Sequence, residues 1–310
     1  MAVVSDSSAG EALAAPLPAE RTSRQRADTQ PLVELPLEPV EPGRQVPGHQ
    51  VPADPPPQIE AAVRPRWLGW ETVLLLGLSL GRSGVDSVVS LIDKLTQPQA
   101  LSAQSSVLNG TYVQNREWLD FIYQVVGLAE GFVAPALALL LLARSPGGPG
   151  FGIGFTPARL RRDALPGLAF AALIGIPGLG LVWLAHTFGF NTQIVASGLP
   201  DVWYRLPVLL VSALQNATSE EIIVMGFLLT RLAQLGWTRE RSVLSAAVLR
   251  GSYHLYQGFG GFAGNAVMGL LFGWWFTRTR RVLPLLVAHF VIDAVSFIGY
   301  VYLSPHISWI

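Results

Sequence analysis

Five residues in the C-terminal half of the chain have side chains suited to hydrolytic chemistry. Glu220 and Glu221 are adjacent in the apolar run SEEIIVMGFLLTRL, His254 lies in LRGSYHLYQGFGG, and His289 and Asp293 lie in LPLLVAHFVIDAV. Carboxylates and imidazoles are the groups that most often move protons in active sites. A charge at the centre of a bilayer costs at least about 2.5–3.5 kcal/mol, so each one needs a partner, a cavity or a role. Three apolar runs that carry such residues therefore favour a site over structure alone.

The spacing of these residues indicates how they can act together. Neighbouring helix positions diverge by about 100°, so Glu220 can face a cavity while Glu221 holds a supporting group. Crowded, partly desolvated carboxyl groups also suit general acid and base work. His289 and Asp293 are one turn apart and share a helix face. They can address a substrate oxygen, a water or a metal, or Asp293 can orient the ring.

Other polar residues in apolar runs have simpler interpretations. Arg82 and Asp86 are four residues apart, so we expect them to neutralise each other. Glu130 is interpreted as a buried, hydrogen-bonded carboxyl group. Asn109 and Asn216 lie in sequons, to which we assign no function, and Asn216 is expected to be buried.

The elements that position these residues must be membrane helices. The 310 residues are 50% hydrophobic and 14% charged, with a mean hydropathy of +0.40. This is too apolar for an ordinary water-soluble domain. A net charge of zero offers no basic field for nucleic acid, and the absence of cysteine excludes disulfides, thiolate metal sites and a cysteine nucleophile. The lipid bilayer is therefore the expected partner.

We predict an all-α, polytopic transmembrane bundle over residues 66–310. From Trp67 onward the chain contains apolar stretches near the roughly 20 residues that cross about 30 Å of hydrocarbon. There are seven spans, or eight if the long first stretch contains two. The predicted spans are residues 67–92, 118–143, 164–188, 205–235, 242–257, 262–278 and 282–303.

The N-terminal residues 1–65 have a different composition. Prolines such as Pro52 and Pro55 alternate with Glu, Arg and Gln, and no apolar periodicity is present. This composition predicts a disordered tail. The glycines of GFGGFAGNAVMGLLFG, in contrast, indicate a tight turn followed by close helix packing.

Arginine positions predict the orientation in the membrane. They cluster before the first span and after the second, fourth and sixth, so every second loop is basic. The positive-inside rule then places the N terminus and these loops in the cytoplasm, and the C terminus outside. Abundant Ala, Gly, Pro and Arg favour the plasma membrane of a GC-rich bacterium. The basic residues are Arg64, Arg66, Arg144, Arg159, Arg161, Arg162, Arg239, Arg241, Arg278, Arg280 and Arg281.

The three polar segments resemble the signature of the CAAX protease and bacteriocin-processing family, which is EExxxR, then FxxxH, then HxxxN or HxxxD. The resemblance covers about residues 205–300. It implies an intramembrane endopeptidase that acts on a membrane-associated peptide or protein. It further implies that Glu220 activates the hydrolytic water with help from His254, and that Glu221 supports them. His289 and Asp293 would bind and polarise the scissile carbonyl.

Two positions depart from this signature. The family arginine is Met225, and the family phenylalanine is Arg250, one turn before His254. We expect Arg250 to supply the missing charge by pairing with Glu221 or Glu220. Arg250→Phe should then lower folding yield, and Met225→Arg should recover it.

The sequence leaves the role of zinc and the class of function open. His254, His289 and Glu220 are adequate zinc ligands, and the family carries a metalloprotease label. The same residues can act on water directly, there is no HExxH, and we slightly favour a site without an obligate metal. A non-catalytic immunity or scaffold module, in which Met225 marks lost activity, is an alternative. A proton-coupled transporter is another, but no inverted repeats of broken helices are visible.

Overall fold

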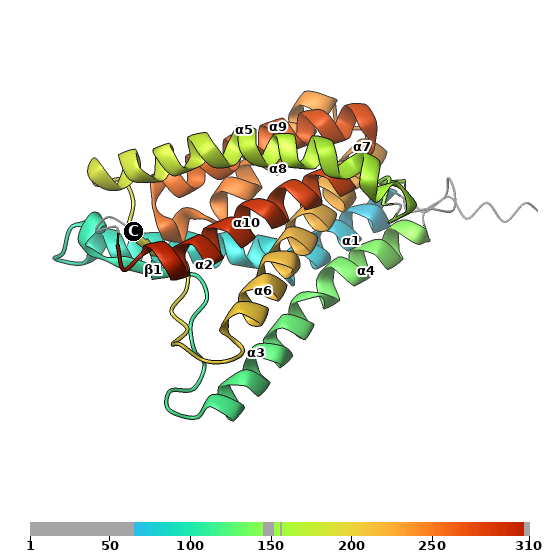
Figure 1. Ribbon diagram of the computed structural model, residues 1–310. Helices are drawn as coiled ribbons and strands as arrows, with labels where there is room; N and C mark the ends of the chain where they lie inside the picture. The colour runs from blue at the N-terminus through green and yellow to red at the C-terminus, as the bar shows by residue number, and fades with distance from the viewer. Residues whose placement is uncertain (1–64, 145–151, 156, 307–310) are drawn as a thin grey trace, which may run out of the picture. The chain divides into compact units, whose positions relative to one another are not determined.

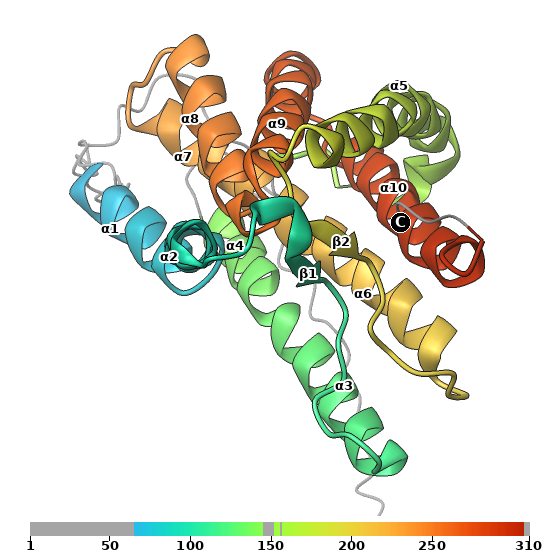
Figure 2. The ribbon, with the colours of Figure 1, turned by 90° about the vertical axis from the view of Figure 1, so that its left-hand side faces the viewer.

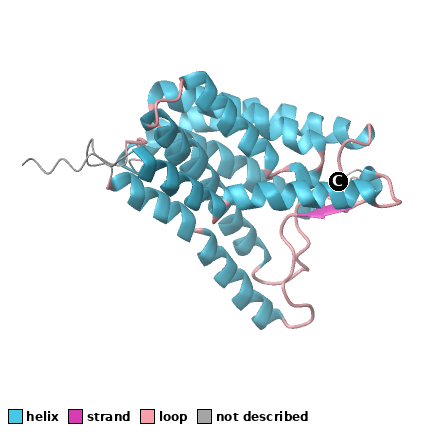
Figure 3. Ribbon diagram, turned by 180° about the vertical axis from the view of Figure 1, so that it is seen from behind, coloured by secondary structure: helices cyan, strands magenta, loops and turns pink. Residues whose placement is uncertain are grey.

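The computed structural model describes residues 65–144, 152–155 and 157–306, and these are mostly helical (Figure 1, Figure 3). The predicted tail lies outside the described residues except for Pro65, where the first helix begins. The α-helices are α1 Pro65–Gly77, α2 Leu80–Thr96, α3 Glu117–Gly131, α4 Val133–Ala143, α5 Leu160–Thr187, α6 Arg205–Glu220, α7 Leu229–Gln234, α8 Arg239–Ser252, α9 Phe259–Thr279 and α10 Leu283–Leu303. Short helical segments are η1 Leu101–Ala103, η2 Pro157–Arg159, η3 Glu221–Leu228 and η4 Leu255–Gln257, and the strands are β1 Ser105–Val107 and β2 Gln193–Val195.

Each predicted span coincides with a helix or a run of helices, but fewer of these qualify as membrane spans. The first pair, α1 and α2, is bent by 48° and counts at most as one candidate. Helix α8 has 14 residues, or about 21 Å at 1.5 Å per residue, which is shorter than the hydrocarbon core. The prediction of seven or eight spans is therefore not confirmed. Among the described residues, four segments are long and apolar enough to cross a bilayer: Glu117–Ala143, Leu160–Thr187, Arg205–Gln234 and Leu283–Leu303.

The segment Arg205–Gln234 is the centre of the fold. Its most apolar window is 67% buried, compared with 11% for the window of α5. Helix α10 packs against both α5 and α6, and α8 packs against α9 (Figure 2). Leu165, Leu173 and Ile176 of α5 remain exposed, as expected for a helix whose outer face contacts lipid. The buried centre can therefore hold polar groups away from lipid.

The central segment changes its helical type directly after Glu220. Helix α6 ends at Glu220, the π-helix η3 follows, and α7 continues from Leu229. A π-helix is rare and is often found at functional sites. All eight residues of η3 are buried, and Met225 belongs to the main hydrophobic core. The position of the family arginine is thus occupied by an apolar core side chain.

The described helix ends beside the predicted basic loops, such as the start of α1, the end of α4 and the start of α5, lie at one end of the helical domain (Figure 1). Arg231 of α7 forms an ion pair with Glu71 of α1 and donates to the carbonyl of Leu141 of α4. Arg280, between α9 and α10, donates to the hydroxyl of Thr230 of α7. Arg280 belongs to one of the predicted basic loops, whereas Arg231 lies within a predicted span.

A two-stranded parallel sheet, β1 with β2, lies away from the basic loops and was not expected in an all-α fold. Ser106 of β1 donates to the carbonyl of Tyr256 at 2.8 Å. Lys94 of α2 donates to the same carbonyl at 2.7 Å and to the Ser106 hydroxyl. Ser87 of α2 donates to the carbonyl of Tyr253 at 2.8 Å. Residues on both sides of His254 are therefore attached to α2 and β1.

The glycine-rich stretch forms the expected turn and close helix contact. Gly258 has φ 114°, and a Cβ there would lie 2.4 Å from the carbonyl oxygen of Phe190. A side chain at this position is excluded because its φ is positive and because a Cβ would clash with neighbouring backbone atoms. A Cβ on Gly269 of α9 would lie 2.8 Å from Cα of Ala247 of α8. Glycine therefore allows these two helices to approach closely.

Candidate active site

All five predicted residues meet at the centre of the fold. Glu220 ends α6 and Glu221 begins η3, whereas His254 follows α8, and His289 and Asp293 lie on α10. Pairwise contacts connect Glu220 with His254, Glu221 with His289, and His289 with Asp293. We call these five residues the Glu/His cluster. The residues that the sequence predicts as a site are thus brought together.

Arg250 lies between the two glutamates. Its Nη1 is 2.7 Å from Oε1 of Glu221, and its Nη2 is 3.2 Å from Oε2 of Glu220. Nη2 is also 3.1 Å from Nδ1 of His289. The predicted pairing is therefore confirmed, and it involves both glutamates. A guanidinium from α8 supplies the charge that Met225 of η3 does not.

The two ring nitrogens of His289 contact different partners. Its Nδ1 is 2.9 Å from Oε1 of Glu221 and contacts Arg250 as well. Its Nε2 is 3.7 Å from Oδ2 of Asp293. The predicted shared face of His289 and Asp293 is confirmed.

The side chains of the site differ in exposure. Glu221 and Arg250 are completely buried, with exposed fractions of 0%. Glu220 retains 10%, His254 16% and Asp293 19%. Glu220, His254 and Asp293 therefore retain some solvent exposure, whereas Glu221 and Arg250 have none.

Glu220 and His254 face each other without a direct hydrogen bond. Oε1 of Glu220 lies 3.8 Å from Nε2 of His254, which exceeds hydrogen-bonding distance. Nε2 is buried and has no hydrogen-bond partner among the described residues, and such an atom normally binds protein or water. The other ring nitrogen lies 3.3 Å from Nε2 of Gln257. The two facing atoms are thus placed to hold one water between them.

Two further residues touch the cluster and were missed as site residues. The hydroxyl of Tyr253 donates to Oε2 of Glu220 at 2.8 Å. Nδ2 of Asn216 donates to Oδ2 of Asp293 at 3.2 Å. Asn216 was expected to be buried but is only half-buried. It lies one turn before Glu220, and this spacing is the signal that could have found it. Nothing in the pattern distinguishes Tyr253 from an ordinary core aromatic.

The arrangement does not fit a zinc site. The described residues contain no group of three or more His, Asp or Glu placed to hold a metal ion. Of the candidate ligands His254, His289 and Glu220, the last two contact the guanidinium of Arg250, at 3.1 Å and 3.2 Å. A fixed positive charge therefore lies close to the ligand atoms that a zinc ion would need within about 2.0–2.2 Å.

The other charged residues of the apolar runs lie outside the cluster. Arg82 and Asp86 form the expected pair, with Nε 3.5 Å from Oδ2, and both side chains are exposed. Glu130 is exposed, so its interpretation as a buried carboxyl group was wrong. Its helix, α3, is only lightly covered by neighbouring elements, which leaves this face open.

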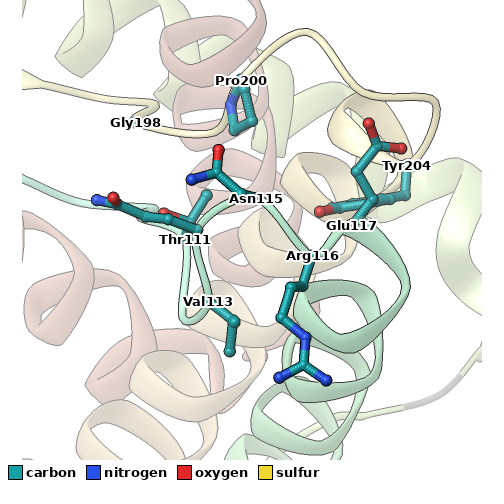
Figure 4. A pocket seen from close by; sticks show the side chains of 9 residues that line it. Thr111, Val113, Asn115, Arg116, Glu117, Gly198, Pro200 and Tyr204 are labelled. Atoms are coloured by element: carbon teal, nitrogen blue, oxygen red, sulfur yellow. The ribbon is translucent and has the colours of Figure 1, made fainter.

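A separate pocket of about 260 Å³ contains no residue of the Glu/His cluster (Figure 4). It lies between the loop that leads into α3 and the loop that precedes α6. Its lining includes Asn115, Arg116, Glu117, Pro200 and Tyr204.

Comparison with known proteins identifies a family for the region that holds the cluster. Residues 202–295 match the family model Rce1-like, described as Type II CAAX prenyl endopeptidase Rce1-like. The matched range contains all five residues of the cluster and confirms the resemblance to the CAAX protease and bacteriocin-processing family. No curated protein and no solved structure matches the chain significantly. Together with the candidate spans, the family match indicates a multi-pass membrane protein with CAAX protease character.

Proposed function

We propose that this chain, whose residues 202–295 belong to the CAAX protease and bacteriocin-processing family, is an intramembrane endopeptidase that uses Glu220 and His254 to activate water. The observation that carries the proposal is the pair of facing atoms Glu220 Oε1 and His254 Nε2, 3.8 Å apart, on side chains that retain 10% and 16% of their exposure. Peptide hydrolysis needs a base beside the attacking water and donors beside the carbonyl oxygen. The cluster contains residue types for both tasks.

The first step is attack of water on the scissile carbonyl. Glu220 takes a proton from the water through Oε1 while Nε2 of His254 orients the water. Tyr253 and Arg250 hold the other carboxylate oxygen, Oε2, which leaves Oε1 free for the proton. The new C–O bond converts the carbonyl into a tetrahedral oxyanion.

The second step is collapse of this oxyanion. The C–N bond breaks, and Glu220 returns its proton to the leaving amine, so that a new carboxyl and a new amino terminus result. His289 assists the oxyanion when its proton is on Nε2. Nδ1 lies 3.1 Å from Nη2 of Arg250, which only donates, and 2.9 Å from Oε1 of Glu221, which only accepts, so the proton on Nδ1 depends on which contact the ring keeps.

The proposed substrate is a peptide or protein that is itself associated with the membrane. The site belongs to the buried central segment, and apolar helices surround it. The proposed orientation places the basic loops and the N terminus in the cytoplasm. It rests on the alternation of arginines along the sequence.

The alternative of a non-catalytic immunity or scaffold module loses its main argument. It depends on Met225, which removes the family arginine. Arg250 already places a guanidinium against Glu220 and Glu221, so no charge is missing from the site.

Cleavage of a library of membrane-anchored peptides in liposomes tests the proposal. We expect cleavage by the wild-type protein and a loss of about 10²–10⁴-fold with Glu220→Gln, the range for a general base. Glu130→Gln is the matched control, because it removes another carboxylate of a candidate span that is exposed and distant in sequence. Equal activity of wild type and Glu220→Gln would contradict the mechanism, and an inactive wild type across the library would contradict the function.

A further inference from the structure

Asp293 is poorly suited to stabilise the oxyanion by itself. An ionised carboxylate only accepts hydrogen bonds. Its negative charge would repel an oxyanion that forms beside it, whereas the stabilising groups in such sites are donors. If the proposed endopeptidase function holds, a donor other than Asp293 must therefore stabilise the oxyanion.

Asn216 meets this requirement from a different helix. It lies on α6, one turn before Glu220, and therefore shares the face that carries the proposed base. Its Nδ2 is 3.2 Å from Oδ2 of Asp293. Because the carboxylate can only accept, the amide must turn its NH₂ group toward it, which fixes the amide orientation.

Asn216 and His289 both approach the same oxygen of Asp293. Oδ2 lies 3.2 Å from Nδ2 of Asn216 and 3.7 Å from Nε2 of His289. An amide NH₂ has two N–H groups, so one can remain on Asp293 while the other points at a ligand. A substrate carbonyl oxygen that approaches the second N–H of Asn216 and Nε2 of His289, on the side away from Oδ2, would meet one donor from α6 and one from α10.

We propose that Asn216 is a catalytic residue that donates a hydrogen bond to the oxyanion, together with His289. Asp293 is then a positioning residue: it holds the Asn216 amide and the His289 ring in place. The side chains are accessible enough for this role, because Asn216 is half-buried and Asp293 retains 19% of its exposure.

The proposal distinguishes Asn216 from a merely structural polar partner. Removal of one oxyanion donor lowers kcat by about 10²–10³-fold. Because the donor acts mainly in the transition state, KM should change little. A structural role would instead lower the melting temperature without this split between kcat and KM.

A rescue experiment decides between these roles. The family pattern permits Asn as well as Asp at position 293, so Asp293→Asn moves an amide donor onto α10. We expect Asn216→Ala to lower kcat about 10²–10³-fold. The double variant Asn216→Ala, Asp293→Asn should recover kcat to within about tenfold of wild type.

The controls separate this inference from the proposed function. Asn109→Ala removes a hydrogen bond that another asparagine side chain donates, to the carbonyl of Ala196. This variant should leave kcat unchanged. Glu220→Gln measures the loss of the base. If Glu220→Gln is inactive while Asn216→Ala keeps full activity, the role of Asn216 is overturned but the proposed function stands. The same holds if the double variant shows no recovery. An inactive wild type would overturn both proposals.

Discussion

Nη1 of Arg250 lies 2.7 Å from Oε1 of Glu221, and neither side chain is exposed. Such a pair does not by itself imply high stability, because desolvation offsets much of the attraction. Loss of one partner is different, because it leaves the other charge buried and uncompensated. The pair therefore makes the two residues depend on each other.

We expect Arg250→Met to destabilise the protein by about 3–5 kcal/mol. Thermal unfolding in detergent measures the change. Adding Glu221→Gln should recover part of the loss, because it removes the unpaired buried charge. Arg82→Met is the matched control: it breaks an exposed ion pair with Asp86, and such pairs contribute little. If the double variant were no more stable than Arg250→Met, the coupling would be absent.

Exchange of the charge between helices provides a second test. Arg250→Phe should lower the folding yield, and Arg250→Phe with Met225→Arg should restore it by placing a guanidinium at the family position. Gel filtration of detergent-purified protein measures the folded fraction. The control is Met225→Arg alone, which adds a second cation to a fully buried position and should fold poorly. The compensation hypothesis fails if the double variant folds no better than Arg250→Phe.

Tyr253→Phe removes the hydroxyl that donates to Oε2 of Glu220. A hydrogen bond to a charged group contributes about 1.5–3 kcal/mol, so kcat should fall by roughly tenfold or more. Steady-state cleavage of the best library peptide measures this change. Tyr112→Phe, on the loop before α3, is a control that should retain activity. Unaltered kcat in Tyr253→Phe would mean that Arg250 alone holds Oε2.

Gly269→Val should displace Arg250 as well as separate two helices. A Cβ at this position would lie 2.8 Å from Cα of Ala247 and 3.3 Å from Cδ of Arg250. We expect a loss of about 1–3 kcal/mol from overpacking, measured by thermal unfolding, together with lower activity. Gly299→Ala on α10 is the control, because nothing lies within 4 Å of a Cβ there. Equal stability of both variants would show that the helices can separate freely.

Chelation should leave activity unchanged. The guanidinium of Arg250 contacts two of the three candidate zinc ligands, so we expect cleavage rates with and without chelator to agree. Elemental analysis of the purified protein should give well under one zinc per chain. A stoichiometric metal whose removal abolishes cleavage would contradict this prediction and require rearrangement around Arg250.

The positions of the helices could be predicted from the sequence because apolar length is a local property. Every predicted stretch contains a helix, although His254 lies in the turn that follows α8. The number of membrane crossings could not be predicted equally well. The first stretch bends between Gly77 and Leu80, and α8 is short, and both features depend on packing. The strands β1 and β2 have three residues each, too few to show a period of two.

The residues of the Glu/His cluster could be predicted from the sequence, but some of the contacts around them could not. Arg250 was found because an unpaired charge must have a partner, and Glu220 and Glu221 were the available ones. The π-helical turn after Glu220 depends on tertiary contacts, and the helix propensities of the residues in EIIVMGFL do not predict it. Asn216 was noticed only as part of a sequon. Its contact with Asp293 spans 77 positions, and a single sequence offers no signal for such a pair.

The tether from Lys94 to the carbonyl of Tyr256 has a consequence for how the protein can be divided. Lys94 and Ser106 precede the range that matches the family model, yet both hold the chain two residues after His254. The recognisable core is therefore not a portable module. If residues 202–295 were grafted into another membrane protein, that protein would need to supply a cation and a hydroxyl group that bind the carbonyl of Tyr256. Without them, the segment that carries His254 would not be held in place.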